Sequence, residues 1–196
     1  MSKHHFSFQE VFKFGLAKTQ PHAWFIFLTF IIIGIILSSV RSLLFFDAVI
    51  SLMVGLSLAS ISLMISRNQH FTFQDLYNPL LSQKRVLKFI LLTIVYVIAV
   101  AVGTVLFVLP GIYLAVRFKF FPFVVLEHEN ASLPDLIKMT YKITENNFWS
   151  VFLFLVIMTL LNIAGFLLFV IGLLVTIPMS LFAFAHVYNR LKEHSL

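Results

Sequence analysis

Six long apolar runs constrain the fold of this chain more than any other feature of its sequence. They cover residues 23–40, 48–65, 86–109, 111–126, 148–170 and 172–188. A helix that crosses the hydrocarbon core of a bilayer needs about 20 mainly apolar residues, and each run has this length or nearly so. Hydrophobic residues make up 60% of the chain and charged residues only 11%, which argues against a disordered protein or an ordinary soluble enzyme. We therefore predict an all-α polytopic membrane protein with six transmembrane helices.

The six runs pair into three tight hairpins, because the breaks within each pair are short. Pro110 and Gly111 separate the third run from the fourth, and we expect the chain to reverse direction there, since proline ends a helix and glycine tolerates turn conformations. Two further prolines, Pro122 and Pro178, lie inside the fourth and sixth runs. Each removes one backbone hydrogen bond, so both are candidates for a break or kink in a membrane helix.

Lysine and arginine are distributed very unevenly between the two sides of the predicted membrane. Arg41 is alone on one side, whereas the other side carries Lys3, Lys13, Lys18, Arg67, Lys84, Arg85, Lys88, Lys138, Lys142, Arg190 and Lys192. The positive-inside rule then places both termini in the cytoplasm and the three hairpin turns outside. The net charge of +6 fits attraction to anionic lipid headgroups better than binding of nucleic acid, because the basic residues border apolar spans. We expect no cleaved signal peptide.

A short signature precedes each hairpin and divides the chain into three repeat units. It consists of a hydroxyl residue with an acid three positions later, as in Ser7 and Glu10, Thr72 and Asp75, and Ser132 and Asp135. This is the capping-box pattern, and it predicts that a short amphipathic helix starts at each place. We expect these helices to lie in the headgroup plane, with their apolar sides against lipid or packed on protein. Pro79 should end or kink the second near Asn78. The units cover about 7–66, 72–127 and 132–191 of a single membrane domain, residues 1–196.

Two basic residues, Arg117 and Lys119, fall within the predicted fourth span. A charge near the centre of a bilayer costs several kcal/mol unless it is paired, hydrated or able to reach an interface. Being two positions apart, the side chains point to different sides of a helix, unless Pro122 distorts it. A structural role, a site for a lipid phosphate or other anion, and a transport site remain open for both residues.

The sequence offers little material for catalysis or for binding a metal or cofactor. Cysteine is absent, which removes disulfides, thiolate ligands and cysteine nucleophiles. Glu127, His128 and Glu129 are consecutive and cannot easily converge on one ion, so a solvated loop is favoured over a metal site. His186 and Asn162 lie within spans, where we expect them to form hydrogen bonds between helices. We predict no enzymatic activity, no metal and no cofactor.

A stretch of the second half carries a recognisable pattern: LPGIYLAVR at residues 109–117, FPF at 121–123, an acidic segment, and a helix ending in NFW at 147–149. It resembles the membrane-domain family that is fused to some glycerophosphoryl diester phosphodiesterases, and the related YciC-type bacterial inner-membrane proteins. The resemblance implies a six-helix module of the bacterial inner membrane whose role is poorly understood. The phosphodiesterase chemistry of that family belongs to a separate soluble domain, for which this chain has no room, so the activity is not transferred.

These observations predict a non-enzymatic inner-membrane module. It would engage anionic lipid, or a membrane protein partner, through its basic cytoplasmic amphipathic helices, without binding nucleic acid. The alternative is a transporter or a lipid- or anion-handling protein, with a site at Arg117 and Lys119 near the kink at Pro122.

Overall fold

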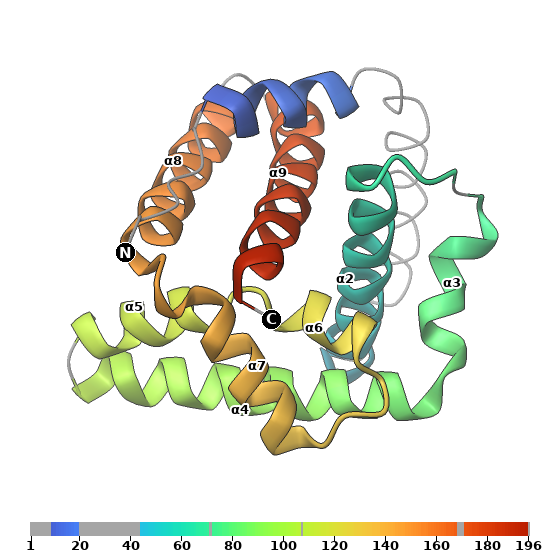
Figure 1. Cartoon of the computed structure of the whole chain (residues 1–196), viewed down its shortest axis with the longest axis vertical. Helices are drawn as coiled ribbons and strands as arrows, with labels where there is room; N and C mark the ends of the chain where they lie inside the picture. The colour runs from blue at the N-terminus through green and yellow to red at the C-terminus, as the bar shows by residue number, and fades with distance from the viewer. Residues whose placement is uncertain (1–8, 20–43, 71, 107, 168–170, 196) are drawn as a thin grey trace.

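The computed structural model describes residues 9–19, 44–70, 72–106, 108–167 and 171–195, and within these ranges the regular structure is entirely helical (Figure 1). The predicted all-α class is therefore confirmed for this part of the chain. The first predicted span, residues 23–40, lies outside the described residues, as do Ser7 and Arg41. After a helix over residues 9–19, the elements are α2 (Leu44–Ser66), α3 (Gln74–Leu81), α4 (Gln83–Leu106), α5 (Val108–Arg117), α6 (Phe121–Glu127), α7 (Leu133–Glu145), α8 (Phe148–Leu167) and α9 (Ile171–Ser195).

Four segments of the described residues are long and apolar enough to cross a membrane. They are Ala48–Ser66, Gln83–Leu106, Val108–Glu127 and Phe148–Leu167, and they coincide with the second to fifth predicted runs. The sixth run forms most of α9, although α9 is not one of these four candidate spans. The chain is thus a helical protein with at least four candidate membrane spans.

Close backbone contacts between glycines and their neighbours hold the α4–α5 and α8–α9 hairpins together. A Cβ atom on Gly111 would lie 2.1 Å from Thr104 Oγ1 and 2.8 Å from the Thr104 amide nitrogen. On Gly172, it would lie 2.3 Å from the carbonyl oxygen of Gly165. Only glycine allows the two arms of each hairpin to approach this closely.

The reversal between α4 and α5 comes earlier than we predicted. α4 ends at Leu106 and α5 begins at Val108, so Pro110 and Gly111 lie in the first turn of α5 and not in the connection. Proline is tolerated there because the first amides of a helix have no partner within the helix. The glycine is required for close packing on α4 and not for a turn conformation.

The prolines have different effects on their helices. At the candidate span Val108–Glu127, α5 ends at Arg117, residues 118–120 form a turn, and Pro122 lies in the first turn of α6. Pro178, by contrast, lies inside the continuous helix α9. The second short helix does not end near Asn78, because α3 continues through Pro79 to Leu81. Only two residues follow Pro79, so few intrahelical bonds are at stake, and the Asn78 side chain bonds Asp75 at 3.0 Å.

The two capping signatures in the described residues each form half of a capping box. The Ser132 hydroxyl accepts a hydrogen bond from the Asp135 amide at 3.3 Å. At the start of α3 the carboxylate makes the reciprocal bond instead, since Asp75 accepts from the Thr72 amide at 2.7 Å. In both places a hydroxyl residue and an acid three positions later begin a short helix, as the pattern predicts.

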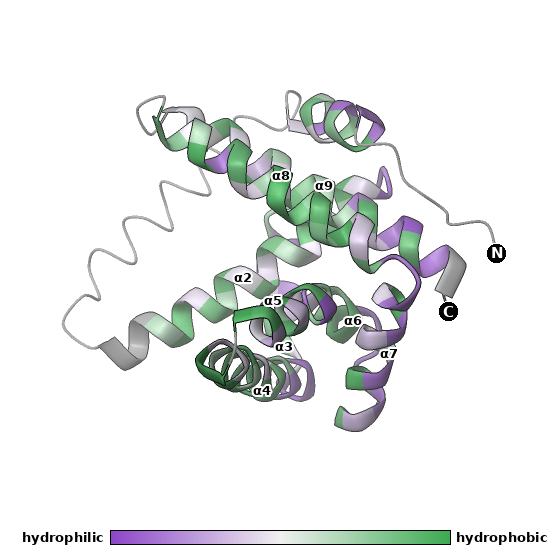
Figure 2. Ribbon diagram, turned by 90° about the vertical axis from the view of Figure 1, so that its left-hand side faces the viewer, coloured by the Kyte–Doolittle hydropathy of each residue, from purple (hydrophilic) through white to green (hydrophobic). Residues whose placement is uncertain are grey.

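The α4–α5 hairpin is oriented differently from the other long helices. In Figure 1, α4 and α5 lie across α8 and α9; Figure 2 shows α4 and α5 end-on, with α2 inclined to α8 and α9. The core between these groups contains fully buried side chains from several helices, among them Phe120, Val124, Phe154 and Tyr188. Many apolar side chains of α4 remain exposed, including Ile94, Val97 and Val105, as expected for a helix that faces lipid.

Candidate functional site

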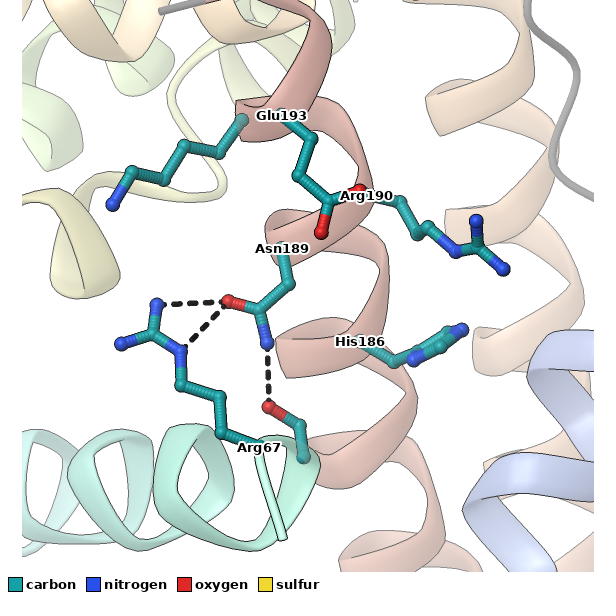
Figure 3. A pocket seen from close by; sticks show the side chains of 7 residues that line it. Arg67, His186, Asn189, Arg190 and Glu193 are labelled. Atoms are coloured by element: carbon teal, nitrogen blue, oxygen red, sulfur yellow. Dashed lines mark hydrogen bonds between the residues drawn. The ribbon is translucent and has the colours of Figure 1, made fainter. Parts of the chain in front are cut away.

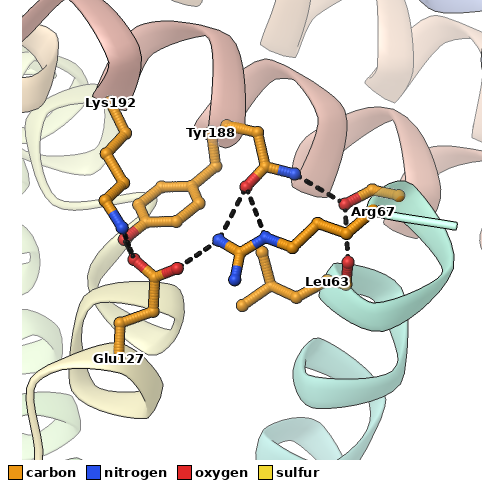
Figure 4. A network of polar contacts seen from close by, with 7 residues as sticks. Leu63, Arg67, Glu127, Tyr188 and Lys192 are labelled. Atoms are coloured by element: carbon orange, nitrogen blue, oxygen red, sulfur yellow. Dashed lines mark hydrogen bonds and ion pairs between the residues drawn. The ribbon is translucent and has the colours of Figure 1, made fainter. Parts of the chain in front are cut away.

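The ends of three helices meet in one polar network, the Glu127 cluster, which we define as Arg67, Glu127, Tyr188, Asn189 and Lys192 (Figure 4). Glu127, at the end of α6, accepts hydrogen bonds from the Tyr188 hydroxyl at 2.5 Å and from Lys192 Nζ at 2.7 Å. It also pairs with Arg67, which follows the last residue of α2. The Glu127 side chain is only 11% exposed. One nearly buried carboxylate thus joins α2, α6 and α9.

Asn189 completes this network on the side of α2. Its side-chain oxygen accepts hydrogen bonds from Arg67 Nη2 at 2.8 Å and Nε at 3.2 Å, and its amide nitrogen donates to Ser66 Oγ at 2.7 Å. Tyr188 is fully buried and stacks on Phe123 of α6, with ring centres 5.2 Å apart. Because two cations share one carboxylate, the cluster keeps a residual positive charge.

An open pocket of about 590 Å³ lies beside the cluster, between α2 and α9. Its lining residues are Ser66, Arg67, His186, Asn189, Arg190, Lys192 and Glu193. Figure 3 shows Arg67 and Asn189 on one side of α9, while His186 and Arg190 point to the other side. Three of the seven lining side chains are permanently basic, so the pocket offers several donors for an anionic group.

The helix over residues 9–19 contacts two of the lining residues, His186 and Arg190. The Phe14 ring stacks on His186 with ring centres 4.0 Å apart, and Glu10 pairs with Arg190. His186 Nε2 lies 3.8 Å from the Glu10 carboxylate and is buried without a hydrogen-bond partner among the described residues. Our expectation that His186 forms a hydrogen bond between helices is thus not met in this part of the chain. The same expectation is confirmed for Asn162, which donates to Ser180 across α8 and α9 at 3.0 Å.

Glu129, two residues beyond Glu127, binds a different helix. It accepts a hydrogen bond from Ser82 and pairs with Arg85 of α4 at 2.6 Å. Lys88 donates to the carbonyl oxygens of Glu129 and Ala131, both at 2.6 Å. The Ser82 hydroxyl and the nearby Arg85 guanidinium hold the pKa of Glu129 below its ordinary value. The Glu127–Glu129 segment, which we predicted to be a solvated loop, therefore ties α4 to α2 and α9.

Arg117 lies in an aromatic cage that is almost closed. Its guanidinium carbon is 4.5, 5.1 and 5.4 Å from the ring centres of Tyr141, Tyr113 and Phe148, and Nε donates to the Tyr113 hydroxyl at 3.1 Å. The residue is 7% exposed, and among the described residues no carboxylate pairs with it and Nη1 has no hydrogen-bond partner. Cation–π contacts are thus the main attraction on this charge.

Lys119 does not share this cage. Its ammonium nitrogen lies 5.0 Å from the ring centre of Phe184 on α9, and the residue is exposed. The turn at residues 118–120 therefore separates the two bases instead of bringing them to one pocket. An anion site built from both Arg117 and Lys119, as the alternative hypothesis requires, would need a rearrangement of this turn.

Sequence reasoning missed the Glu127 cluster, although it singled out several of its neighbours. Arg67 and Lys192 counted only as flanking charges, and Tyr188 only as the end of an apolar run. An available signal was the acid at the end of the fourth run, since few acids occur near the predicted spans. The sequence could not pair it with partners that lie 60 to 65 residues away.

Comparison with protein-family models, curated proteins and solved structures finds no match for this chain. The resemblance carried by residues 109–149 accordingly stays a prediction.

Proposed function

We propose that this chain is a multi-span membrane protein without catalytic activity, which engages anionic lipid headgroups through the short basic helices that precede its hairpins. In this proposal six spans form three repeat units, residues 7–66, 72–127 and 132–191, in a bacterial inner membrane with both termini in the cytoplasm. The four candidate spans support its general form. The resemblance at residues 109–149 agrees with the same architecture.

The observation that carries the lipid proposal is an exposed apolar stripe on α3. Phe73, Tyr77 and Leu81 are spaced by four residues, which places them on one side of a helix, and they are 58%, 48% and 70% exposed. Lys84 and Arg85 follow at once in α4. Exposed aromatic and aliphatic groups beside basic residues are typical of a segment that lies at a membrane interface.

The other two short helices differ from each other in how far their apolar side chains are exposed. In the helix over residues 9–19, Phe12 and Leu16 are 39% and 40% exposed and Lys13 lies between them in the sequence, which resembles the arrangement of α3. α7 instead buries Leu136 and Ile143 completely, so its apolar side packs on protein. We therefore assign contact with lipid to the first two short helices and a packing role to α7.

The position of the Glu127 cluster supports three repeat units. Arg67, Glu127 and Lys192 each lie near the end of one proposed unit, and all three belong to one network. A shared meeting point of this kind is expected when three similar units pack around a common centre. Because the α4–α5 hairpin has a different direction from the other long helices, only the ends of the three units are arranged alike.

Photocrosslinking would test the lipid proposal. The photoreactive residue benzoylphenylalanine replaces Tyr77 in the full chain, which is reconstituted into vesicles with or without phosphatidylglycerol. We expect adducts with lipid at Tyr77, enriched for phosphatidylglycerol, and none at the fully buried control position Leu136. Adducts with protein alone at Tyr77 would instead favour the hypothesis of a membrane protein partner.

A second candidate is a transport or anion-handling role at Arg117. The buried Nη1 atom without a hydrogen-bond partner among the described residues favours it, because a bound anion would supply the missing acceptor. Substituting Gln for Arg117 would then abolish retention of an anion, whereas Lys119→Gln, outside the cage, would leave it unchanged. Equal retention in both variants and the wild type would reject this candidate.

A further inference from the structure

We infer that the open pocket between α2 and α9 binds a phosphate group, which belongs either to a membrane lipid or to a soluble phosphate ester. The inference rests on the proposed function in one point only: a lipid can supply the phosphate if the chain lies in a membrane. The site is separate from the Arg117 cage and from the exposed stripe of α3. It is defined by Arg67 and Lys192, which line the pocket and converge on Glu127.

The donors that the pocket presents are only partly used by the protein. Arg67 bonds through Nε and Nη2, and its Nη1 makes no hydrogen bond with a residue that the structure describes. Lys192 has one hydrogen bond, to Glu127, and an ammonium group has three donors. About a third of each of these two side chains is exposed. A phosphate can therefore contact them without displacing Glu127.

The location of the pocket matches the depth of a lipid phosphate. The candidate span Ala48–Ser66 ends directly before Arg67, and Ser66 and Arg67 both line the pocket. The ends of a membrane helix lie at the headgroup level. A lipid beside α2 would thus present its phosphate to Arg67 while its acyl chains follow the apolar helix.

The charge balance favours a single anionic group. Arg67 and Lys192 share the single carboxylate of Glu127, which leaves a net positive charge there, and one further acid, Glu193, lines the pocket. Each base thus has a carboxylate that holds it in place, which orients the donors before a ligand arrives. Glu193 opposes an anion, so its neutral variant should bind more tightly.

The test uses native mass spectrometry of the full chain released into mild detergent with added phosphatidylglycerol. Lys192→Gln should reduce the apparent affinity about tenfold, the usual effect of removing one charge-assisted hydrogen bond, and Glu193→Gln should raise it about threefold. The matched control is Arg85→Gln, because Arg85 also pairs with a single glutamate but lies outside the pocket. Arg67→Gln is a second pocket variant, used only if its fold is intact by thermal denaturation.

Competition identifies the source of the phosphate. If inorganic phosphate or glycerol 3-phosphate at millimolar concentration displaces phosphatidylglycerol, the pocket takes the phosphate group itself; if neither does, the acyl chains are required and the ligand is a lipid. The inference is overturned if Lys192→Gln and Glu193→Gln leave the affinity unchanged, or if Arg85→Gln lowers it as much. Lipid adducts at Tyr77 would still support the proposed function in that event, so the two failures are distinguishable.

Discussion

The Glu127 carboxylate lies 2.7 Å from the Lys192 ammonium, which comes 65 residues later in the chain. Arg67 approaches the same carboxylate from α2. In a protein whose core consists mainly of interchangeable apolar side chains, this contact selects one arrangement of α2, α6 and α9, because any other would leave a charge without a partner. The cluster also fixes the shape of the neighbouring pocket.

Replacing Glu127 with Gln should destabilise the protein by about 2 kcal/mol, since Arg67 and Lys192 lose their shared counter-charge. The value lies below the usual range for a fully buried ion pair because both bases are partly exposed. The free energy of unfolding in mixed micelles measures it. Glu145→Gln, at an exposed acid without an ion pair in the described residues, should stay within about 0.5 kcal/mol of the wild type. Equal effects would contradict a special role of Glu127.

Gly172→Ala should disrupt the α8–α9 hairpin, because the added Cβ would lie 2.3 Å from the backbone oxygen of Gly165. The two helices would have to move apart, at a cost of about 1–3 kcal/mol. Gly55→Ala in α2 is the control, since its Cβ would meet no atom within 4 Å, and it should be neutral or slightly stabilising. Thermal denaturation of both variants compares them. Similar loss of stability in both would mean that helix propensity, and not contact, governs these positions.

Arg117→Lys should destabilise the fold by about 1–2 kcal/mol despite keeping the charge. A planar guanidinium stacks on the three rings of the cage, whereas an ammonium group cannot stack and is more strongly hydrated. Lys119→Arg serves as the reciprocal exchange and should change stability by less than about 0.5 kcal/mol, because Lys119 is exposed. Denaturant titration in micelles gives both values. Full stability of Arg117→Lys would show that only the positive charge matters.

Acid should remove one contribution to stability through Glu129. The Ser82 hydroxyl and the Arg85 guanidinium lower its pKa in the folded state, so the ionised carboxylate stabilises the fold above the ordinary pKa of about 4.3. This contribution is lost as the pH falls through the lowered folded-state pKa. The melting temperature of the wild type should exceed that of Glu129→Gln at pH 7, and the difference should shrink below about pH 4.3. A difference that does not change with pH would contradict this assignment.

The sequence predicted the helices far better than their connections. Apolar runs of sufficient length located α2, α4, α8 and α9, because apolar composition and period are local properties. The reversal expected at Pro110 lies before Val108, since proline is equally acceptable in the first turn of a helix. Pro79 remains inside α3, where its missing amide removes only the one hydrogen bond to the carbonyl of Asp75.

The candidate site was only partly accessible from the sequence. Arg117 attracted attention because a basic residue within an apolar run is unusual, but its three aromatic partners come from three different helices. Glu127 is conspicuous only as an acid at the end of an apolar run, which does not say what it pairs with. Its partners Arg67 and Lys192 are recognisable only after α2, α6 and α9 have packed together.

The sequence by itself determined that this chain forms long apolar helices suited to a membrane, with glycine and proline near their ends or within them. It also determined that short capped helices precede two of the described hairpin arms. These features depend on side-chain hydropathy and on hydrogen bonds between residues a few positions apart. Only the tertiary structure decided which charges meet, which apolar stripes stay exposed and where a pocket opens between α2 and α9. Those outcomes depend on the packing of residues distant in the sequence, and a spacing pattern along one helix carries no information about the helix it will contact.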